Sequence, residues 1–276
     1  MTLIRVAHSP DSDDAFMFYA LAHQLIDTGK YRFEHVLSDI ETLNQKAFDG
    51  AYEVTAVSIH AYAYLDDRYA LLSSGASMGD GYGPILVARE PMKAEDLQGK
   101  VVAIPGKLTS AALMLKMWQP GLETRIMDFD AIGPAVLSGE VDAGVIIHEG
   151  QLTWQDEGLF NIVDFGLWWA EENDGLPLPL GGNCVRRDLG EEMITEVSAL
   201  LKASIEYSLS HREEALDYAL EYGRGLAREK ADRFVGMYVN ELTVDYGERG
   251  RRAVRLFLEG AHREGLIPKL PRLDFC

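Results

Sequence analysis

His148 is the residue whose type and position most strongly suggest chemistry. It directly follows residues 144–147, an apolar run typical of a buried strand. A titratable side chain at the carboxyl end of such a strand faces the crevice where α/β folds bind ligands. A histidine in that place can take up a proton near neutral pH and act as a general base. The position alone is equally compatible with a histidine that only forms a hydrogen bond, and Glu149, which should point to the other face, is expected to be structural.

Two hydroxyl side chains, Thr109 and Ser110, stand at the expected start of a helix. They follow a loop that matches neither the dinucleotide-binding glycine pattern nor a P-loop. The free backbone N–H groups at a helix start bind carboxylates, so we expect the carboxylate of a ligand at this position. The alternative is that Thr109 only caps the helix, which contributes about 1 kcal/mol. The two roles are compatible.

Two further polar residues are candidates for ligand contacts. Ser58 ends an apolar strand and faces the crevice in the same sense as His148, although a small residue that closes the packing is an equal alternative. Asn44 lies within a helix, where asparagine is a poor helix former. It is therefore a candidate for a hydrogen bond to a ligand or between lobes, with a solvent-facing asparagine as the default.

The acidic loop with Asp11, Asp13 and Asp14 invites comparison with a metal site, but it lacks the glycine and distal glutamate of a calcium loop. We expect a solvated capping loop that lies beside the crevice. The two cysteines, Cys184 and Cys276, have no zinc-binding spacing and are expected to be inert thiols. The sequence therefore predicts no metal site.

The elements that position these residues form two α/β units. Strands over 3–8, 31–37 and 54–59 alternate with helices over 15–26 and 40–48, a pattern that predicts a parallel sheet with its site at the carboxyl ends of the strands. A second unit follows, with strands over 85–89, 100–104, 124–129 and 143–147 and helices over 109–118 and 132–137. Residues 168–182 are rich in Gly, Pro and Trp and are interpreted as a return crossing. The chain beyond is mostly helical.

The predicted fold class is therefore α/β with two lobes and a ligand cleft between them. Lobe one comprises residues 1–88 and 181–276, and lobe two comprises residues 89–180. An internal echo supports two related lobes: Gly50 and Gly139 each follow a helix and precede an acidic residue and an apolar strand. A glycine in the left-handed conformation explains both helix ends.

Charge narrows the range of partners. The 276 residues include 44 acidic and 26 basic ones, which gives a formal net charge of -18 and argues against nucleic acid and anionic membranes as partners. The first residues lack the pattern of a secretory signal, and no stretch approaches the roughly 20 apolar residues of a membrane span. We expect a cytoplasmic protein that binds a small anionic organic molecule. Its oligomeric state stays open.

Several motifs together resemble the 1,4-dihydroxy-6-naphthoate synthase family of the futalosine route to menaquinone. The resemblance spans nearly the whole chain and is carried by Ser9-Pro10, Phe16-x-Phe18-Tyr19-Ala20-Leu21, Glu41-Thr42-Leu43-Asn44, Gly83-Pro84-Ile85-x-Val87-Ala88-Arg89, Val145-Ile146-Ile147-His148-Glu149 and Gly175-Leu176-Pro177-Leu178-Pro179-Leu180-Gly181.

The resemblance implies a type II periplasmic-binding-protein fold without transport. It implies a lyase that converts cyclic dehypoxanthine futalosine into 1,4-dihydroxy-6-naphthoate and needs no cofactor. The histidine of the Ile-Ile-His-Glu motif is the proposed base in that family and matches His148. The family's hydroxyl loop matches Thr109 and Ser110, and its polar pocket positions match Asn44 and Ser58.

One departure from the family pattern leaves the substrate open. After Ser-Pro the family usually reads Cys-Pro-Asn-Asp-Thr, whereas residues 11–15 here read Asp-Ser-Asp-Asp-Ala. Two added acids beside a pocket for an anion are unfavourable electrostatically. The alternatives are chorismate dehydratase, a sister enzyme on the same fold, and a binding protein without chemistry that serves a transporter or a sensor.

Overall fold

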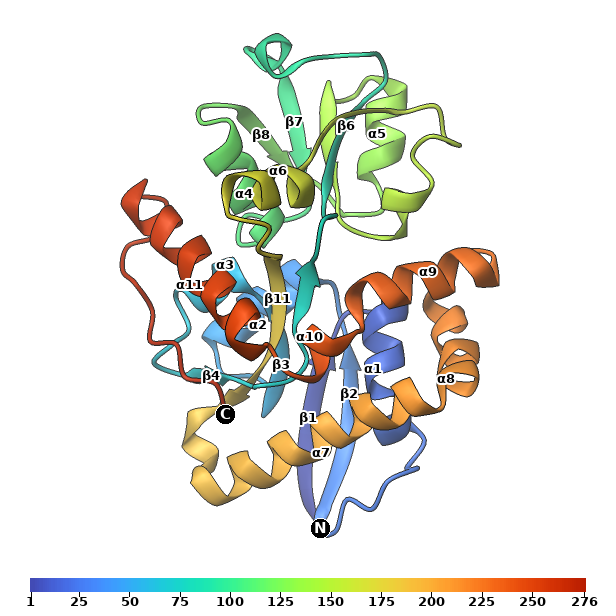
Figure 1. The fold of residues 1–276 in the computed structure, drawn as a ribbon, viewed down its shortest axis with the longest axis vertical. Helices are drawn as coiled ribbons and strands as arrows, with labels where there is room; N and C mark the ends of the chain where they lie inside the picture. The colour runs from blue at the N-terminus through green and yellow to red at the C-terminus, as the bar shows by residue number, and fades with distance from the viewer.

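The chain folds into two α/β lobes, each built on its own sheet (Figure 1). The computed structural model describes all residues 1–276. The chain passes from lobe one to lobe two after β5 and returns before β11, so lobe one is discontinuous in sequence. No helix has both the length and the apolar character needed to span a membrane.

The sheet of lobe one has the strand order β2-β1-β3-β11-β4, and β5 also pairs with β11. Its strands are β1 (Thr2–His8), β2 (Tyr31–Leu37), β3 (Val54–Ser58), β4 (Tyr69–Leu71), β5 (Ser77–Gly79) and β11 (Leu178–Arg186). The connecting helices are α1 (Ser12–Ala22), α2 (Ile40–Phe48) and α3 (Ile59–Tyr62). The N-terminus of α2 is fixed by Asp39, whose carboxylate accepts from the Thr42 N–H at 2.9 Å.

The sheet of lobe two has the order β10-β6-β9-β7-β8. Its strands are β6 (Ile85–Ala88), β7 (Val101–Ile104), β8 (Glu123–Ile126), β9 (Ala143–Ile146) and β10 (Phe160–Asp164). Its helices are α4 (Ser110–Trp118), α5 (Ile132–Ser138) and α6 (Phe165–Glu172).

The two lobes share one topology. β1 runs parallel to β2 and β3, and β7 runs parallel to β8 and β9. β3, β11 and β4 then pair antiparallel, as do β9, β6 and β10. Gly50 and Gly139, with φ of 64° and 77°, follow α2 and α5 and adopt the left-handed conformation that the internal echo predicts. The start of α1 therefore corresponds to the start of α4, and the end of β3 to the end of β9.

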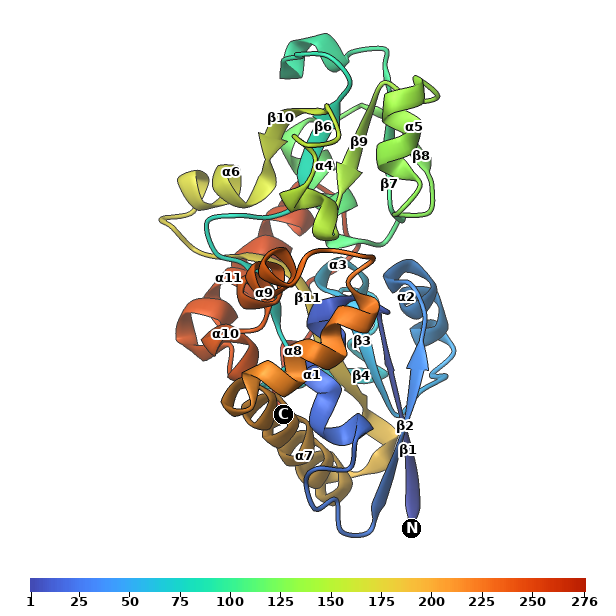
Figure 2. The same cartoon turned by 90° about the vertical axis from the view of Figure 1, so that its right-hand side faces the viewer.

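The remaining helices belong mainly to lobe one. They are α7 (Glu191–Ser210), α8 (Arg212–Ala219), α9 (Arg228–Tyr238), α10 (Glu241–Val244) and α11 (Gly247–Arg263). α7 and α8 pack against α1, and α9 lies close to the level where the lobes meet (Figure 2). Four 3₁₀ turns occur at Ala94–Leu97, Glu149–Leu152, Arg187–Leu189 and Leu220–Tyr222.

Three expectations need correction. Residues 168–182 are not a plain crossing, because the end of α6 and most of β11 lie there, and the pairing of β11 with β3, β4 and β5 outweighs its prolines and glycines. Each sheet combines parallel and antiparallel strands, so it is not purely parallel. Helix α1 ends at Ala22, and Gln24 soon after it has a left-handed φ of 56°.

The expected lobe limits at residues 88 and 181 also shift slightly. β6 pairs only within the second sheet, so residues 85–88 belong to lobe two. β11 begins at Leu178 and pairs within the first sheet. The crossovers therefore fall between β5 and β6 and between α6 and β11.

Candidate active site

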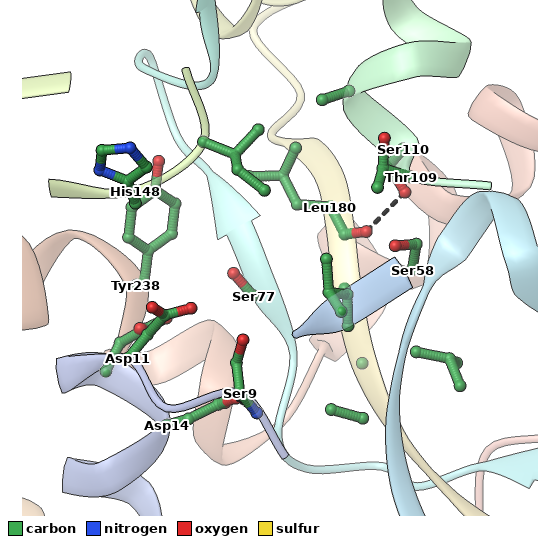
Figure 3. Close-up of a pocket in the computed structure, with 18 of the residues that line it drawn as sticks. Ser9, Asp11, Asp14, Ser58, Ser77, Thr109, Ser110, His148, Leu180 and Tyr238 are labelled. Carbon is green, nitrogen blue, oxygen red and sulfur yellow. Dashed lines mark hydrogen bonds between the residues drawn. The ribbon is translucent and has the colours of Figure 1, made fainter. Parts of the chain in front are cut away.

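A pocket lies between the lobes, and its walls come from corresponding places in each. The walls include the loop and first turn of α1, the end of β3, the first turn of α4, the segment after β9, part of β11 and the end of α9 (Figure 3). The predicted residues Ser58, Thr109, Ser110 and His148 all line it, whereas Asn44 does not.

His148 lies just beyond the end of β9 and is partly exposed to the pocket. Its Nδ1 accepts a hydrogen bond from the Gly150 N–H at 3.0 Å, and its ring meets the Phe129 ring edge-on at 5.5 Å. Desolvation lowers the pKa of the imidazole, and the nearby Glu149 carboxylate opposes this shift. The ring is therefore neutral at neutral pH. Because Nδ1 accepts, its proton is on Nε2 in this arrangement.

At the start of α4, the hydroxyl groups of Thr109 and Ser110 both donate their protons to backbone carbonyls. Thr109 Oγ1 donates to the Gly106 carbonyl at 3.0 Å and accepts from the Ala112 N–H at 3.2 Å, which confirms the predicted N-cap. Ser110 Oγ donates to the Leu180 carbonyl at 2.5 Å. The backbone N–H groups of Ser110 and Ala111 have no acceptor within the protein. These N–H groups, rather than the hydroxyls, are the free donors for an anion.

Ser58, the last residue of β3 in lobe one, presents a hydroxyl donor near Thr109 and Ser110 (Figure 3). Asn44 is buried behind it and donates from Nδ2 to Ser58 Oγ at 3.0 Å, while its Oδ1 accepts from the Ser58 N–H at 2.9 Å. Because Ser58 Oγ accepts from Asn44, its own proton remains free to point toward a ligand. The geometry thus gives Asn44 a supporting place beneath the pocket.

The first turn of α1 forms an acidic wall. Asp14 Oδ2 accepts from the Ser9 N–H at 2.7 Å, and Asp11 pairs with Arg224 at 2.6 Å. Burial, reinforced by the neighbouring carboxylates, raises the pKa of Asp13 well above its usual range and that of Asp14 to about 7. These two carboxyls therefore hold protons at a pH where ordinary aspartates are ionised. The repulsion of an anionic ligand expected from the sequence is correspondingly smaller.

The pocket is polarised although its lining contains no lysine or arginine. One end offers the N–H groups of α4 and the Ser58 hydroxyl, and the other end offers the carboxyls of α1. The starts of α1 and α4 are equivalent in the two lobes, but only α1 has acids, Asp13 and Asp14, in its first turn. A helix N-terminus favours negative charge, and at α1 the protein's own carboxyls occupy that position. An anionic group of a ligand is therefore best placed at α4.

Several lining residues come from segments that sequence reasoning assigned elsewhere. The sequence indicated only a mostly helical chain beyond residue 182, yet Phe234 and Tyr238 of α9 line the pocket, and Tyr238 Oη donates to Gln151 Oε1 at 2.7 Å. Ser77 and Phe129 were not singled out at all. Helical spacing cannot distinguish a core face from a pocket wall, because both are apolar and turned away from solvent.

Gly83 lies outside the pocket lining, against the backbone of Gly166, where a Cβ would come within 2.8 Å of the Gly166 nitrogen. Trp169 is buried and its indole donates to the Pro177 carbonyl at 3.1 Å. Trp168 does not line the pocket. Glu149 is a buried ion-pairing residue, as expected of a structural role.

Comparisons with known proteins agree with this architecture. The 1,4-dihydroxy-6-naphthoate synthase of Thermus thermophilus is 44% identical over 99% of this chain and 98% of its own. A crystal structure of a protein from Archaeoglobus fulgidus has a TM-score of 0.92 and 50% identity, covering 96% of this chain and 98% of that one. The alkanesulfonate-binding protein of Xanthomonas axonopodis, bound to MOPS, has a TM-score of 0.70 at 14% identity, covering 98% and 96% of the two chains.

The last of these similarities shows the fold, that of the periplasmic binding proteins, and confirms the two-lobed architecture. The relative from Thermus confirms the resemblance seen in the sequence motifs. The family described as menaquinone biosynthesis matches residues 4–263. This chain belongs to the menaquinone biosynthesis family.

Proposed function

We propose that this protein converts cyclic dehypoxanthine futalosine into 1,4-dihydroxy-6-naphthoate in the cytoplasm, as a carbon–carbon lyase with His148 as the general base. The observation that carries the proposal is the polarised pocket, because the substrate is polarised in the same way. A naphthoate precursor bears a carboxylate at one end, and its sugar-derived fragment bears neutral hydroxyls at the other.

Each end of the pocket suits one end of that substrate. The carboxylate would accept from the Ser110 and Ala111 N–H groups and from the Ser58 hydroxyl. The hydroxyls of the sugar-derived fragment would meet Asp13 and Asp14, whose raised pKa lets a carboxyl either donate or accept. The departure from the family pattern at residues 11–15 is then compatible with an anionic substrate.

His148 would remove a proton from the substrate. The proton comes from a hydroxyl of the sugar-derived fragment, and the O–H electron pair forms a carbonyl on that fragment as the carbon–carbon bond to the ring breaks. The electrons of the broken bond pass into the ring system and complete its aromaticity. The lowered pKa keeps the imidazole neutral, as a base must be. Since Nδ1 accepts from Gly150, proton uptake requires the ring to release that N–H and turn its lone pair toward the substrate.

The decisive experiment is turnover of cyclic dehypoxanthine futalosine, followed by chromatography and mass spectrometry of the naphthoate. We expect His148→Ala to lower kcat by about 10²- to 10⁴-fold, the usual effect of losing a general base. Matched thermal unfolding of the two proteins serves as the control for folding. ¹⁵N NMR of the imidazole should show the Nε2–H tautomer without ligand.

Other results would redirect the proposal. Wild-type activity in His148→Ala would refute the base role. Turnover of chorismate instead would assign the sister reaction, and tight binding without turnover of either compound would indicate a binding protein.

A further inference from the structure

A buried carboxylate crosses between the lobes next to Asp11, Phe129 and His148, the pocket-lining residues that we call the pocket mouth. Glu149 of lobe two has a side chain only 3% exposed, and both of its oxygens are bonded to lobe one. Ser12 Oγ donates to Oε1 at 3.0 Å, and Arg224 Nη1 donates to Oε2 at 2.8 Å. A carboxylate without Arg224 would be costly to keep in this dry position.

Arg224 connects several parts of this mouth. Its Nη2 binds Asp11 at 2.6 Å, and its guanidinium lies 4.8 Å from the centre of the Phe129 ring, which in turn meets the His148 ring. Its φ of 50° is in the left-handed region that non-glycine residues rarely adopt. Such conformations persist where the surroundings enforce them, often at ligand clamps.

The shared topology of the lobes shows what is special about this contact. Ser12 and Ser110 are the first residues of the equivalent helices α1 and α4, and each bonds to the opposite lobe just beyond a strand end: Ser12 to Glu149, and Ser110 to the His60 N–H at 3.2 Å. Of the two partner residues, only Glu149, the partner of Ser12, also forms an ion pair across the lobes.

The two sides of the pocket differ in what holds them. The largest apolar core includes residues of both lobes, such as Tyr62 and Val102, so it joins the lobes. The core containing Phe16 of α1 and the core containing Ile132 of α5 are separate clusters. The lobes are thus joined by an apolar core in one region and, beside His148, by the polar contacts of Glu149 together with the hydrogen bond from Tyr238 to Gln151.

We propose that Arg224 and Glu149 form a latch that holds the lobes closed at the pocket mouth and keeps the His148 turn in place. Glu149 and Gly150 are consecutive, and the Gly150 N–H binds His148 Nδ1, so fixing the Glu149 carboxylate also fixes the ring. Both latch residues are positioning residues. The catalytic consequence rests on the proposed function, whereas the effect on lobe closure does not.

The test measures lobe separation and catalysis on the same variants. Spin labels at Gln98→Cys in lobe two and Glu214→Cys in lobe one, in a Cys276→Ser background, report the distance between lobes by double electron–electron resonance. Cys184 is buried and can remain. Dilution with unlabelled protein excludes distances between copies.

We expect Arg224→Gln to shift the distance distribution to longer values, because its unpaired Glu149 carboxylate gains hydration only by opening. Glu149→Gln and the double variant remove the buried carboxylate itself, so each should open less than Arg224→Gln. Lys230→Gln is the matched control. It removes another ion pair between the lobes, Lys230–Asp156 at 2.6 Å, whose side chains are 43% and 68% exposed.

Turnover of cyclic dehypoxanthine futalosine supplies the second readout. Arg224→Gln should lower kcat by about 10- to 100-fold through misplacement of His148, with little change in KM. Its acid limb in kcat/KM should move to higher pH, because the Arg224 charge and burial both lower the pKa of His148. Arg224→Lys keeps the positive charge, so it should return the acid limb of kcat/KM to its wild-type pH and recover part of kcat.

Unchanged distances in Arg224→Gln would overturn the latch, whatever its rate. Opening without any change in kcat would overturn the positioning of His148. If the wild type fails to turn over the substrate, the proposed function fails, and the latch is still decided by the distances. If Glu149→Gln does not fold, Arg224→Gln and Arg224→Lys decide the question alone.

Discussion

At the scale of single residues, Asn44 orients the Ser58 side chain. Both polar atoms of its side chain are bonded to Ser58, one to the hydroxyl and one to the backbone N–H. A buried amide satisfied in this way orients its neighbour, and its removal leaves a backbone N–H without a partner. The pocket gains a directed hydroxyl, although Asn44 itself lies outside the lining.

A double-mutant cycle tests this relation. Ser58→Ala should raise KM for the proposed substrate by about five- to tenfold, the value of one hydrogen bond. Asn44→Leu should raise KM similarly in the wild-type background and have much less effect once Ser58 is already alanine. Additive effects in steady-state kinetics would show that Asn44 contributes by a route other than Ser58.

At the scale of elements, the segment that leads from lobe one into lobe two packs its backbone directly against the start of α6. Gly166 is the second residue of α6, and a Cβ there would lie 1.8 Å from the Tyr82 carbonyl oxygen in the segment that leads into lobe two. Neither Gly83 nor Gly166 has a positive φ, so both glycines are needed for space rather than for backbone conformation.

Gly166→Ala should therefore lower the free energy of unfolding by about 1–3 kcal/mol or more, because a backbone oxygen cannot move aside cheaply. Gly133→Ala is the matched control at the second residue of α5, where a Cβ would meet only the Glu157 carboxylate at 3.6 Å. Helix propensity predicts no loss there. Urea unfolding measures both, and equal effects would contradict the crossing as the cause.

At the scale of the whole molecule, burial keeps several histidines neutral. It lowers the pKa of His8 to about 3 and those of His35 and His60 to about 4. The unfolded chain takes up these protons below about pH 6.5, whereas the folded chain does not until pH 3–4. These histidines therefore make their full contribution to the free energy of unfolding above pH 6.5, and this contribution is lost as the pH falls. Asp13 and Asp14, with raised pKa, act in the opposite direction.

His60→Gln isolates one of these contributions. His60 Nδ1 donates to the Thr109 carbonyl at 3.2 Å, a bond that a glutamine amide can replace. The stability of the variant relative to wild type should rise steadily between pH 6.5 and 4.5, measured by urea unfolding. His262→Gln, at an exposed position, is the matched control for the substitution itself. If the stability of His60→Gln changes with pH in parallel with that of the wild type, titration of His60 does not cause the loss of stability at low pH.

The sequence by itself determined most of the local elements and several of the residues that line the pocket. Apolar periodicity with Asp39 and Thr109 specifies the starts of α2 and α4, and the left-handed glycines Gly50 and Gly139 specify the ends of α2 and α5, because these signals act over a few residues. Position at the end of an apolar strand singled out Ser58 and His148, since parallel strands present their carboxyl ends at one edge.

Only the tertiary structure decided which distant residues complete the pocket. β11 contains prolines and glycines and is a strand because β3, β4 and β5 supply its partners. Tyr238 and Arg224 reach the mouth because α9 and the loop before it pack near the junction of the lobes. The pKa of Asp14 and the tautomer of His148 follow from burial and from single hydrogen bonds, which depend on packing in three dimensions.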